Sequence, residues 1–352
     1  MDSDLPPNAF PSRESFRFTG DGGEYFRIWI VNLLLSIVTL GIYSAWAKVR
    51  RLRYFYQHTE VAGSRFDYHG DPIAILKGRI VALILLVAYN FSFDISVEVG
   101  VVTLVVLAVV FPWLLRNSLR FRARYSSYRG LRFSFRGSVG QSYVTFLLFG
   151  ALTALSLYIL APLFHHRLKR YQHGNAWFGS TPFRFDAGVG AFYRVYMITG
   201  LLSLAAAVVA LLMFGGTLEG LAHLREADPR AISVMIGGAF VVLIAIGLLI
   251  GPLFSALINN LIWNHTRLGE HRFDSSLSPW KLMWIGLSNT VLVALTLGLF
   301  MPWAAVRLAR YRAECLTLLP ASNLDDTLAA AEQDIGAVGE ESAEMFDFDI
   351  GL

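Results

Sequence analysis

Apolar runs of about 20 residues recur along this chain of 352 residues, and they constrain its fold more than any other feature. A helix rises about 1.5 Å per residue, so about 20 apolar residues cross the roughly 30 Å of hydrocarbon in a bilayer. Soluble domains carry about 25% charged residues, whereas this chain carries 16%. These observations exclude a soluble enzyme and predict an all-α integral membrane protein.

We expect about seven transmembrane helices. The stretch 79–115 is too long for one span and is interrupted around Asp94 and Glu98, so we divide it into two. A count of six or eight spans is an alternative if short or glycine-broken segments are re-entrant. The expected spans are residues 26–46, 79–93, 97–115, 143–164, 192–214, 231–258 and 279–303.

An internal repeat links these spans. At the end of five apolar runs, Trp or Leu follows a small residue or Pro, and a polar–aromatic or polar–apolar pair comes seven residues later. In four copies a Phe follows the Trp or Leu by 20 residues: Phe66, Phe133, Phe183 and Phe273. The fifth copy lacks this element, but a similar one, Phe16-Arg17-Phe18, precedes the first span. Its alternation predicts short extended elements at the membrane interface, within repeated span–connector units.

The connectors combine aromatic and basic residues, a combination that suits the lipid headgroup layer. They are interpreted as anchors that set helix depth, or alternatively as a substrate or lipid-headgroup site. The expected partners are membrane lipids with anionic headgroups, and nucleic-acid binding is not expected. The predicted interface anchors are Trp46, Arg53, Tyr54, Trp113, Arg120, Arg170, Tyr171, Trp303, Arg310 and Tyr311.

Charge divides the chain into three regions. Residues 1–22 are polar, residues 23–316 form the repeated membrane domain, and residues 317–352 carry nine acidic residues without any Lys or Arg. We expect this acidic tail to be disordered, with docking to a partner as the alternative. The single cysteine, Cys315, excludes a disulfide framework within the chain and a cysteine-based metal cluster.

The orientation depends on whether every expected span crosses. If all seven cross, the connectors fall on both faces, and the positive-inside rule places the C-terminus in the cytoplasm. If each stretch that holds a single span between two repeated Phe elements is instead a re-entrant hairpin, every connector stays on the cytoplasmic side. We expect full crossing.

The sequence contains no phosphate-binding loop, nucleophile elbow or His-Glu-x-x-His motif. We therefore expect no metal, no cofactor and no enzymatic activity. Asn32, Asn259 and Asn260 could line a polar path or join helices by hydrogen bonds. The expected function is transport or permeation of a small solute. The alternative is a structural or lipid-interacting protein without a transported substrate.

A resemblance rests on residues 22–32 and 39–51, in particular on Gly41-Ile42-Tyr43-Ser44-Ala45-Trp46-Ala47-Lys48-Val49-Arg50. This run resembles the YjgN-like family of bacterial inner-membrane proteins, over about residues 13–318. The resemblance implies a multi-span protein of the bacterial inner membrane. It implies no catalytic residues, because the shared domain has no assigned function.

Overall fold

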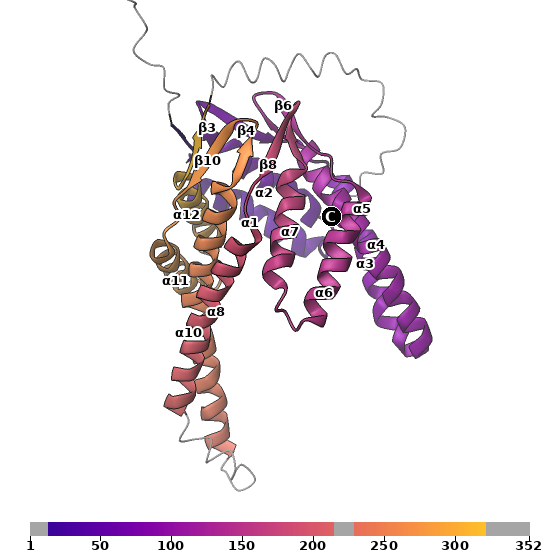
Figure 1. Cartoon of the computed structure of the whole chain (residues 1–352), viewed down its shortest axis with the longest axis vertical. Helices are drawn as coiled ribbons and strands as arrows, with labels where there is room; N and C mark the ends of the chain where they lie inside the picture. The colour runs from indigo at the N-terminus through magenta and orange to yellow at the C-terminus, as the bar shows by residue number, and fades with distance from the viewer. Residues whose placement is uncertain (1–12, 215–228, 322–352) are drawn as a thin grey trace, which may run out of the picture.

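Helical hairpins extend from one closed antiparallel sheet, which lies at one end of the molecule (Figure 1). The computed structural model describes residues 13–214 and 229–321. The strands are β1 (Glu14–Ser15), β2 (Arg17–Phe18), β3 (Thr59–Val61), β4 (Ser64–Tyr68), β5 (Ser126–Tyr128), β6 (Leu131–Phe135), β7 (Ala176–Phe178), β8 (Thr181–Phe185), β9 (Thr266–Leu268), β10 (His271–Ser275) and β11 (Leu316–Leu319). The expectation of an all-α fold is therefore corrected, because the repeated Phe elements are strands of one sheet.

The sheet closes because the N-terminal segment, which contains β1 and β2, pairs with a strand on each side. β1 pairs with β11 and β2 pairs with β3, while Phe16 alone separates β1 from β2. The remaining strands pair with their neighbours in sequence order. The element that the fifth copy lacks is thus supplied by the N-terminus, since Glu14 pairs with Leu318 of β11. Closure leaves no unpaired edge, which is the part of a sheet most prone to aggregation.

Tight turns build the repeated strand pairs. Ala62 and Gly63 between β3 and β4 have φ of 47° and 70°, and Arg129 and Gly130 between β5 and β6 have φ of 49° and 82°. Positive φ at both central residues is typical of two-residue turns whose twist matches that of the flanking strands. Each of the four first strands is followed by a turn that contains a glycine with positive φ, and the constant length of the turn fixes the register of the following Phe.

Two kinds of helical hairpin connect the strand pairs. The long hairpins are α3 (Pro72–Ile95) with α4 (Val97–Arg124), and α8 (Val189–Phe214) with α10 (Pro229–Asn264). The short hairpins are α1 (Gly22–Val38) with α2 (Ser44–Gln57), α5 (Val139–Ser142), π-helix η1 (Tyr143–Leu148) and α6 (Phe149–Leu155) with α7 (Ala161–Gly174), and α11 (Pro279–Leu295) with α12 (Met301–Glu314). The second helix of each hairpin packs against the first helix of the next, and α12 packs against α1.

The expectation of seven spans is wrong for the described residues. Four helices in this part of the chain are long and apolar enough to cross a membrane: Pro72–Ile95, Val97–Arg124, Val189–Ala210 and Ile246–Asn264. The expected spans 26–46, 143–164 and 279–303 each turn back before they end. Hydropathy cannot distinguish a straight apolar helix from one that reverses within an apolar turn. All connectors consequently lie on the side of the sheet, as the re-entrant alternative requires (Figure 1).

The three reversing turns share one design. Their second and third residues have positive φ, for example Leu40 at 50° and Gly41 at 90°. In each turn a hydroxyl accepts from the backbone N–H four residues ahead, as Thr39 Oγ1 does from Tyr43 N at 2.9 Å. Ser156 and Thr296 make the equivalent bonds. The turns are apolar at the tip, where Leu40, Leu157 and Leu297 are 94%, 85% and 94% exposed. Backbone satisfied from within and an apolar tip are what a turn in hydrocarbon requires.

Candidate binding sites

Five phenylalanines, one from each strand pair, form a closed ring inside the sheet. Successive ring centroids lie between 6.2 and 6.5 Å apart around the whole circle. The members are Phe16, Phe66, Phe133, Phe183 and Phe273. The spacing of 20 residues that the sequence holds in four copies therefore places equivalent side chains around one axis, and the N-terminal strand supplies the fifth.

The ring borders an apolar cavity of about 170 Å³. Apart from the ring, its lining comes from Val61, Tyr128, Phe178, Trp263, Leu268, His271 and Leu318. The Tyr128 hydroxyl donates a hydrogen bond to the carbonyl oxygen of Val61 at 2.7 Å, and the Tyr128 side chain lines the cavity. Cavities of about 150 Å³ with such linings stay dry and bind benzene or xenon.

A second cavity, of about 360 Å³, lies against the helix side of this ring. It shares Phe66, Phe133, Phe183 and Trp263 with the apolar cavity. It adds polar side chains from the returning helices α4 and α7, namely Arg122, Gln172 and His173. The two cavities thus follow one another along the axis of the sheet, the apolar one within it and the polar one beneath it.

Arg122 of α4 is the basic residue that lines the lower cavity. The Arg122 guanidinium makes no hydrogen bond or ion pair with the described residues. Burial, together with the charge of Arg122, lowers the pKa of Lys169. Burial and the charges of Arg79 and Arg122 lower the pKa of Lys48. Arg122 therefore repels both Lys48 of α2 and Lys169 of α7, and an anion bound at Arg122 would relieve that repulsion.

The predicted anchor tyrosines are buried and have structural roles. Tyr54, Tyr171 and Tyr311 each approach the residue that caps the first helix of the same short hairpin, 33 positions earlier. Asp21 N donates to the Tyr54 hydroxyl at 2.9 Å, and Ser278 N donates to that of Tyr311 at 2.8 Å. The long hairpins have Phe121 and Leu261 at this position. The tyrosine hydroxyl thus marks the short hairpins, whose two sheet-proximal ends it holds together.

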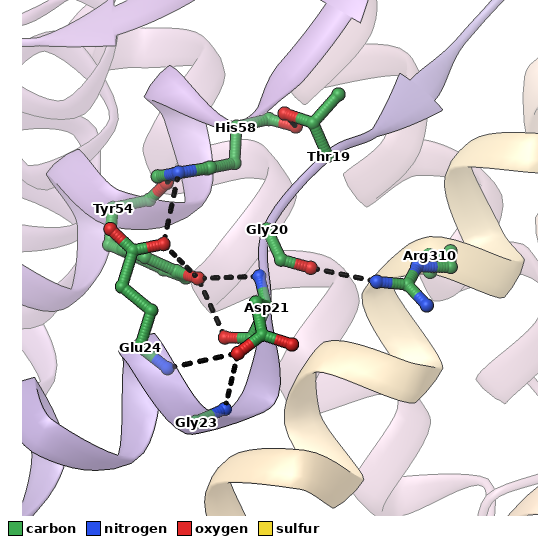
Figure 2. A network of polar contacts seen from close by, with 8 residues as sticks. All are labelled: Thr19, Gly20, Asp21, Gly23, Glu24, Tyr54, His58 and Arg310. Atoms are coloured by element: carbon green, nitrogen blue, oxygen red, sulfur yellow. Dashed lines mark hydrogen bonds and ion pairs between the residues drawn. The ribbon is translucent and has the colours of Figure 1, made fainter.

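Figure 2 shows the contacts of Tyr54 in the first short hairpin, where the first and last repeats meet. The Asp21 carboxylate caps α1 by accepting from Gly23 N and Glu24 N at 2.8 and 3.1 Å, and these bonds lower its pKa. Glu24 lies 3.3 Å from the Tyr54 hydroxyl and 3.6 Å from His58 Nε2. Arg310 of α12 donates to the carbonyl oxygen of Gly20 at 2.8 Å. These contacts join the N-terminal strand to the last helix.

The other predicted anchors lie where the helices meet the sheet. Arg53, Arg120, Arg170 and Arg310 are all exposed. Arg53 donates to the carbonyl oxygen of Tyr68 at 3.4 Å, a contact similar to that of Arg310. Trp46 and Trp113 are half-buried. Trp303 stacks on Phe26 of α1 with centroids 4.9 Å apart, so it joins neighbouring hairpins.

The predicted asparagines do not form one path among the described residues. Asn259 donates to Ser255 O at 2.7 Å within α10, and Asn260 donates to Leu277 O at 3.0 Å. No hydrogen bond of the described residues joins either to Asn32. Asn260 occupies the repeat position of Arg310, and both donate to the backbone before the next helix. Asn259 and Asn260 therefore have structural bonds of their own.

Asn32 lines a separate cavity of about 610 Å³ between α1, α2, α3 and α12. Its side chain is buried, and its Oδ1 has no hydrogen-bond partner. Three cations, Lys48, Arg51 and Arg79, line the same cavity, and none of its described lining residues is acidic. Arg79 donates to the Ser44 hydroxyl. The cavity thus combines unneutralised positive charge with an unused acceptor oxygen.

Two groups of functional candidates were missed from the sequence. The reversing turns carry a readable signal, because Thr39-Leu40-Gly41-Ile42-Tyr43 and Thr296-Leu297-Gly298-Leu299-Phe300 repeat the same pattern. The cluster of Lys48, Arg122 and Lys169 carries none, because only the closed sheet brings α2, α4 and α7 around one axis. Within the described residues, no group of three His, Cys, Asp or Glu side chains could hold a metal ion.

Comparison with known proteins identifies the family. A family described as bacterial proteins of unknown function, DUF898, matches residues 13–345. The chain belongs to this family. It is 28% identical over 270 residues to the inner membrane protein YjgN of Escherichia coli O157:H7, which covers 75% of this chain and 52% of that protein. It is 24% identical over 345 residues to the YjgN protein of Salmonella typhimurium, covering 84% and 86%.

These relatives confirm the resemblance and the location. The protein is an inner-membrane protein with several candidate spans. The chain spans about half the length of the Escherichia coli relatives, including that of strain K12. No solved structure is significantly similar to the chain.

Proposed function

We propose that this protein is a lipid-interacting membrane protein without enzymatic activity, and that the cavity around Asn32 binds the headgroup of an anionic phospholipid. The observation that carries the proposal is the set of three cations around a buried, unpartnered amide oxygen. A phosphate suits Lys48, Arg51 and Arg79. A headgroup hydroxyl would supply the donor that Asn32 Oδ1 lacks. Phosphatidylglycerol offers both groups.

The depth of the cavity supports a headgroup rather than an acyl chain. Asn32 lies 10 residues into α1, about 15 Å below the start of that helix. Leu40 lies about 12 Å deeper at most, by the same rise per residue, and is almost fully exposed. If the cations lie at the headgroups, the tips reach roughly the middle of a bilayer of about 30 Å. Three short hairpins then enter one leaflet, while the long hairpins cross both.

The distribution of basic residues supports a cytoplasmic sheet and C-terminus. The turns after α1, α3, α6 and α11 carry no Lys or Arg, and Arg230 stands at the far end of α10, whereas the connectors beside the sheet are rich in basic residues. Under the positive-inside rule the sheet then faces the cytoplasm. In a Cys315→Ser background, Arg65→Cys should react with a membrane-impermeant maleimide from the cytoplasmic side alone, and Leu40→Cys from neither side. Labelling of Arg65→Cys from the periplasm would contradict this orientation and place the sheet in the periplasm.

Native mass spectrometry with defined lipids tests the headgroup site. The wild-type protein should retain phosphatidylglycerol over phosphatidylcholine. The double variant Lys48→Gln/Arg79→Gln should bind phosphatidylglycerol about 30-fold more weakly, because each basic residue contributes about 1 kcal/mol. Arg120→Gln/Arg170→Gln is the matched control, since these exposed arginines lie outside the cavity. Undiminished binding of phosphatidylglycerol by Lys48→Gln/Arg79→Gln, or an equal loss in the control, would count against a specific site.

A second candidate function is permeation of a small solute along the axis of the sheet. The observation that favours it is the succession of two cavities on that axis. The apolar ring would act as a closed hydrophobic constriction. Reconstituted Phe133→Ser/Phe183→Ser protein should then release a trapped small solute from liposomes faster than the wild type. Equal release rates would argue against permeation by this route.

A further inference from the structure

Along the axis of the sheet, the two cavities change from an apolar lining to a partly polar and basic one, and this order indicates what kind of ligand fits them. The upper one, inside the sheet, is lined by aromatic and aliphatic side chains and has room for about a benzene ring. The lower one adds Arg122, Gln172 and His173 on the helix side. Because the cavities share Phe66 and Phe133, one molecule could occupy both.

We propose that this axial site binds a small amphiphilic anion, with its apolar group inside the phenylalanine ring and its carboxylate or phosphate at Arg122. Arg122 has no acidic partner among the described residues, and a carboxylate or phosphate forms two parallel hydrogen bonds with a guanidinium. Lys169, on the neighbouring returning helix, donates to Gln172 Oε1 at 3.1 Å and adds positive charge beside the cavity. An aryl-alkyl carboxylate matches the volume and the order of these groups.

The order of the two cavities argues against a membrane phospholipid as the ligand. In the leaflet next to the sheet, headgroups lie towards the sheet and acyl chains point away from it. The axial site has the opposite order, since its cations lie on the helix side and its apolar cavity lies within the sheet. A free amphiphile can adopt this orientation. The inference goes beyond the proposed headgroup function and depends on a different cavity.

The repeat itself suggests a variant that fills the apolar cavity. Val61 lines this cavity, and the equivalent position of the third copy is Phe178. Val61→Phe therefore introduces a side chain that the sheet already accommodates at this register. Arg122→Gln removes the charge at the other end and keeps hydrogen-bonding capacity. Arg120→Gln is the control for charge, because Arg120 lies outside both axial cavities.

The experiment titrates the detergent-solubilised full chain with 4-(4-fluorophenyl)butyrate and follows its fluorine NMR signal, with empty micelles as the reference. The wild type and Arg120→Gln should bind the probe equally. Arg122→Gln should weaken binding by about 10-fold or more, as for the loss of a hydrogen bond to a charged group. Val61→Phe should abolish binding, and the uncharged alcohol 4-(4-fluorophenyl)butanol should bind more weakly than the carboxylate.

The outcomes separate this site from the headgroup site and from non-specific uptake. Binding that persists unchanged in both Arg122→Gln and Val61→Phe would overturn the inference. Displacement of the probe by phosphatidylglycerol, or its loss in Lys48→Gln/Arg79→Gln but not in Arg122→Gln, would also overturn it and assign the anion to the Asn32 cavity. Size-exclusion elution and circular dichroism identical to the wild type establish that each variant is folded.

Discussion

The reversing turns should be most sensitive to loss of the hydroxyl that satisfies their backbone. Thr296 Oγ1 donates to Leu292 O at 2.7 Å and accepts from Phe300 N at 3.0 Å. Thr296→Val keeps the shape of the side chain and removes both bonds. A turn in hydrocarbon offers the freed Phe300 N–H no water, so the free energy of unfolding should fall by about 1–3 kcal/mol. The unfolded fraction should rise about 5- to 150-fold.

Thr290→Val is the matched control for this prediction. Thr290 Oγ1 donates to Gly286 O within α11, at 2.9 Å, and no backbone N–H depends on it. Its replacement should change the free energy of unfolding by less than about 0.5 kcal/mol. Reversible unfolding in lipid bicelles, followed by tryptophan fluorescence, measures both variants. Equal effects of the two substitutions would refute the argument, because they would mean that water reaches the turn.

Two further predictions concern the region where the first and last helical hairpins meet. A Cβ atom at Gly22 would lie 2.2 Å from Trp303 Cδ1, whereas nothing lies within 4 Å of one at Gly140. Gly22→Ala should therefore lower the free energy of unfolding by about 1–3 kcal/mol, and Gly140→Ala should not; similar stability of the two variants would contradict this packing. The hydrogen bonds of Asp21 to Glu24 N and Gly23 N lower its pKa below the ordinary 3.8, so its stabilising contribution is complete above that value and disappears as the pH falls through the lowered pKa. Asp21→Asn should be less stable than the wild type at pH 7 and approach it in acid, as measured by unfolding across pH, and a constant difference would exclude this linkage.

The repeat could be predicted closely from the sequence. The fixed spacing from Trp46 to Phe66, and from Trp113 to Phe133, reflects a helix end, a tight turn and a strand of constant length. The alternation Phe-x-Phe also predicted extended segments. These local features depend on nearby residues, so the pattern of the chain is sufficient to show them. That the segments pair with one another could not be predicted, because backbone pairing carries little sequence signal.

Hydropathy could not predict whether the chain crosses the membrane or turns back within an apolar run. Residues 26–46 are predominantly apolar, and a straight span has the same composition as a helix that reverses at Leu40 and Gly41. The positive φ of these residues is the decisive difference. Thr39 and Gly41 were visible in the sequence, and their repetition at Thr296 and Gly298 could have indicated the reversal.

The candidate sites show the same division. Asn32 was selected because an amide within an apolar run is costly unless it has a partner or a function. The structure gives it cationic neighbours from α2 and α3, which the sequence separates from it by up to 47 positions. Asn259 and Asn260 were selected for the same reason, yet their amides donate to backbone carbonyls, within α10 and before α11 respectively. Composition alone could not separate these two cases.

The sequence by itself determined that the chain is embedded in lipid and built from repeated units, because the burial of apolar runs and the spacing of turns are local properties. Only the tertiary structure decided that the units form a circle. Phe16 and Leu318 stand about 300 residues apart, and the pairing of β1 with β11 brings their strands together. That pairing closes the sheet, aligns the five phenylalanines and places Arg122 beneath them. Such a site arises from long-range backbone hydrogen bonds, which no short segment of the chain specifies.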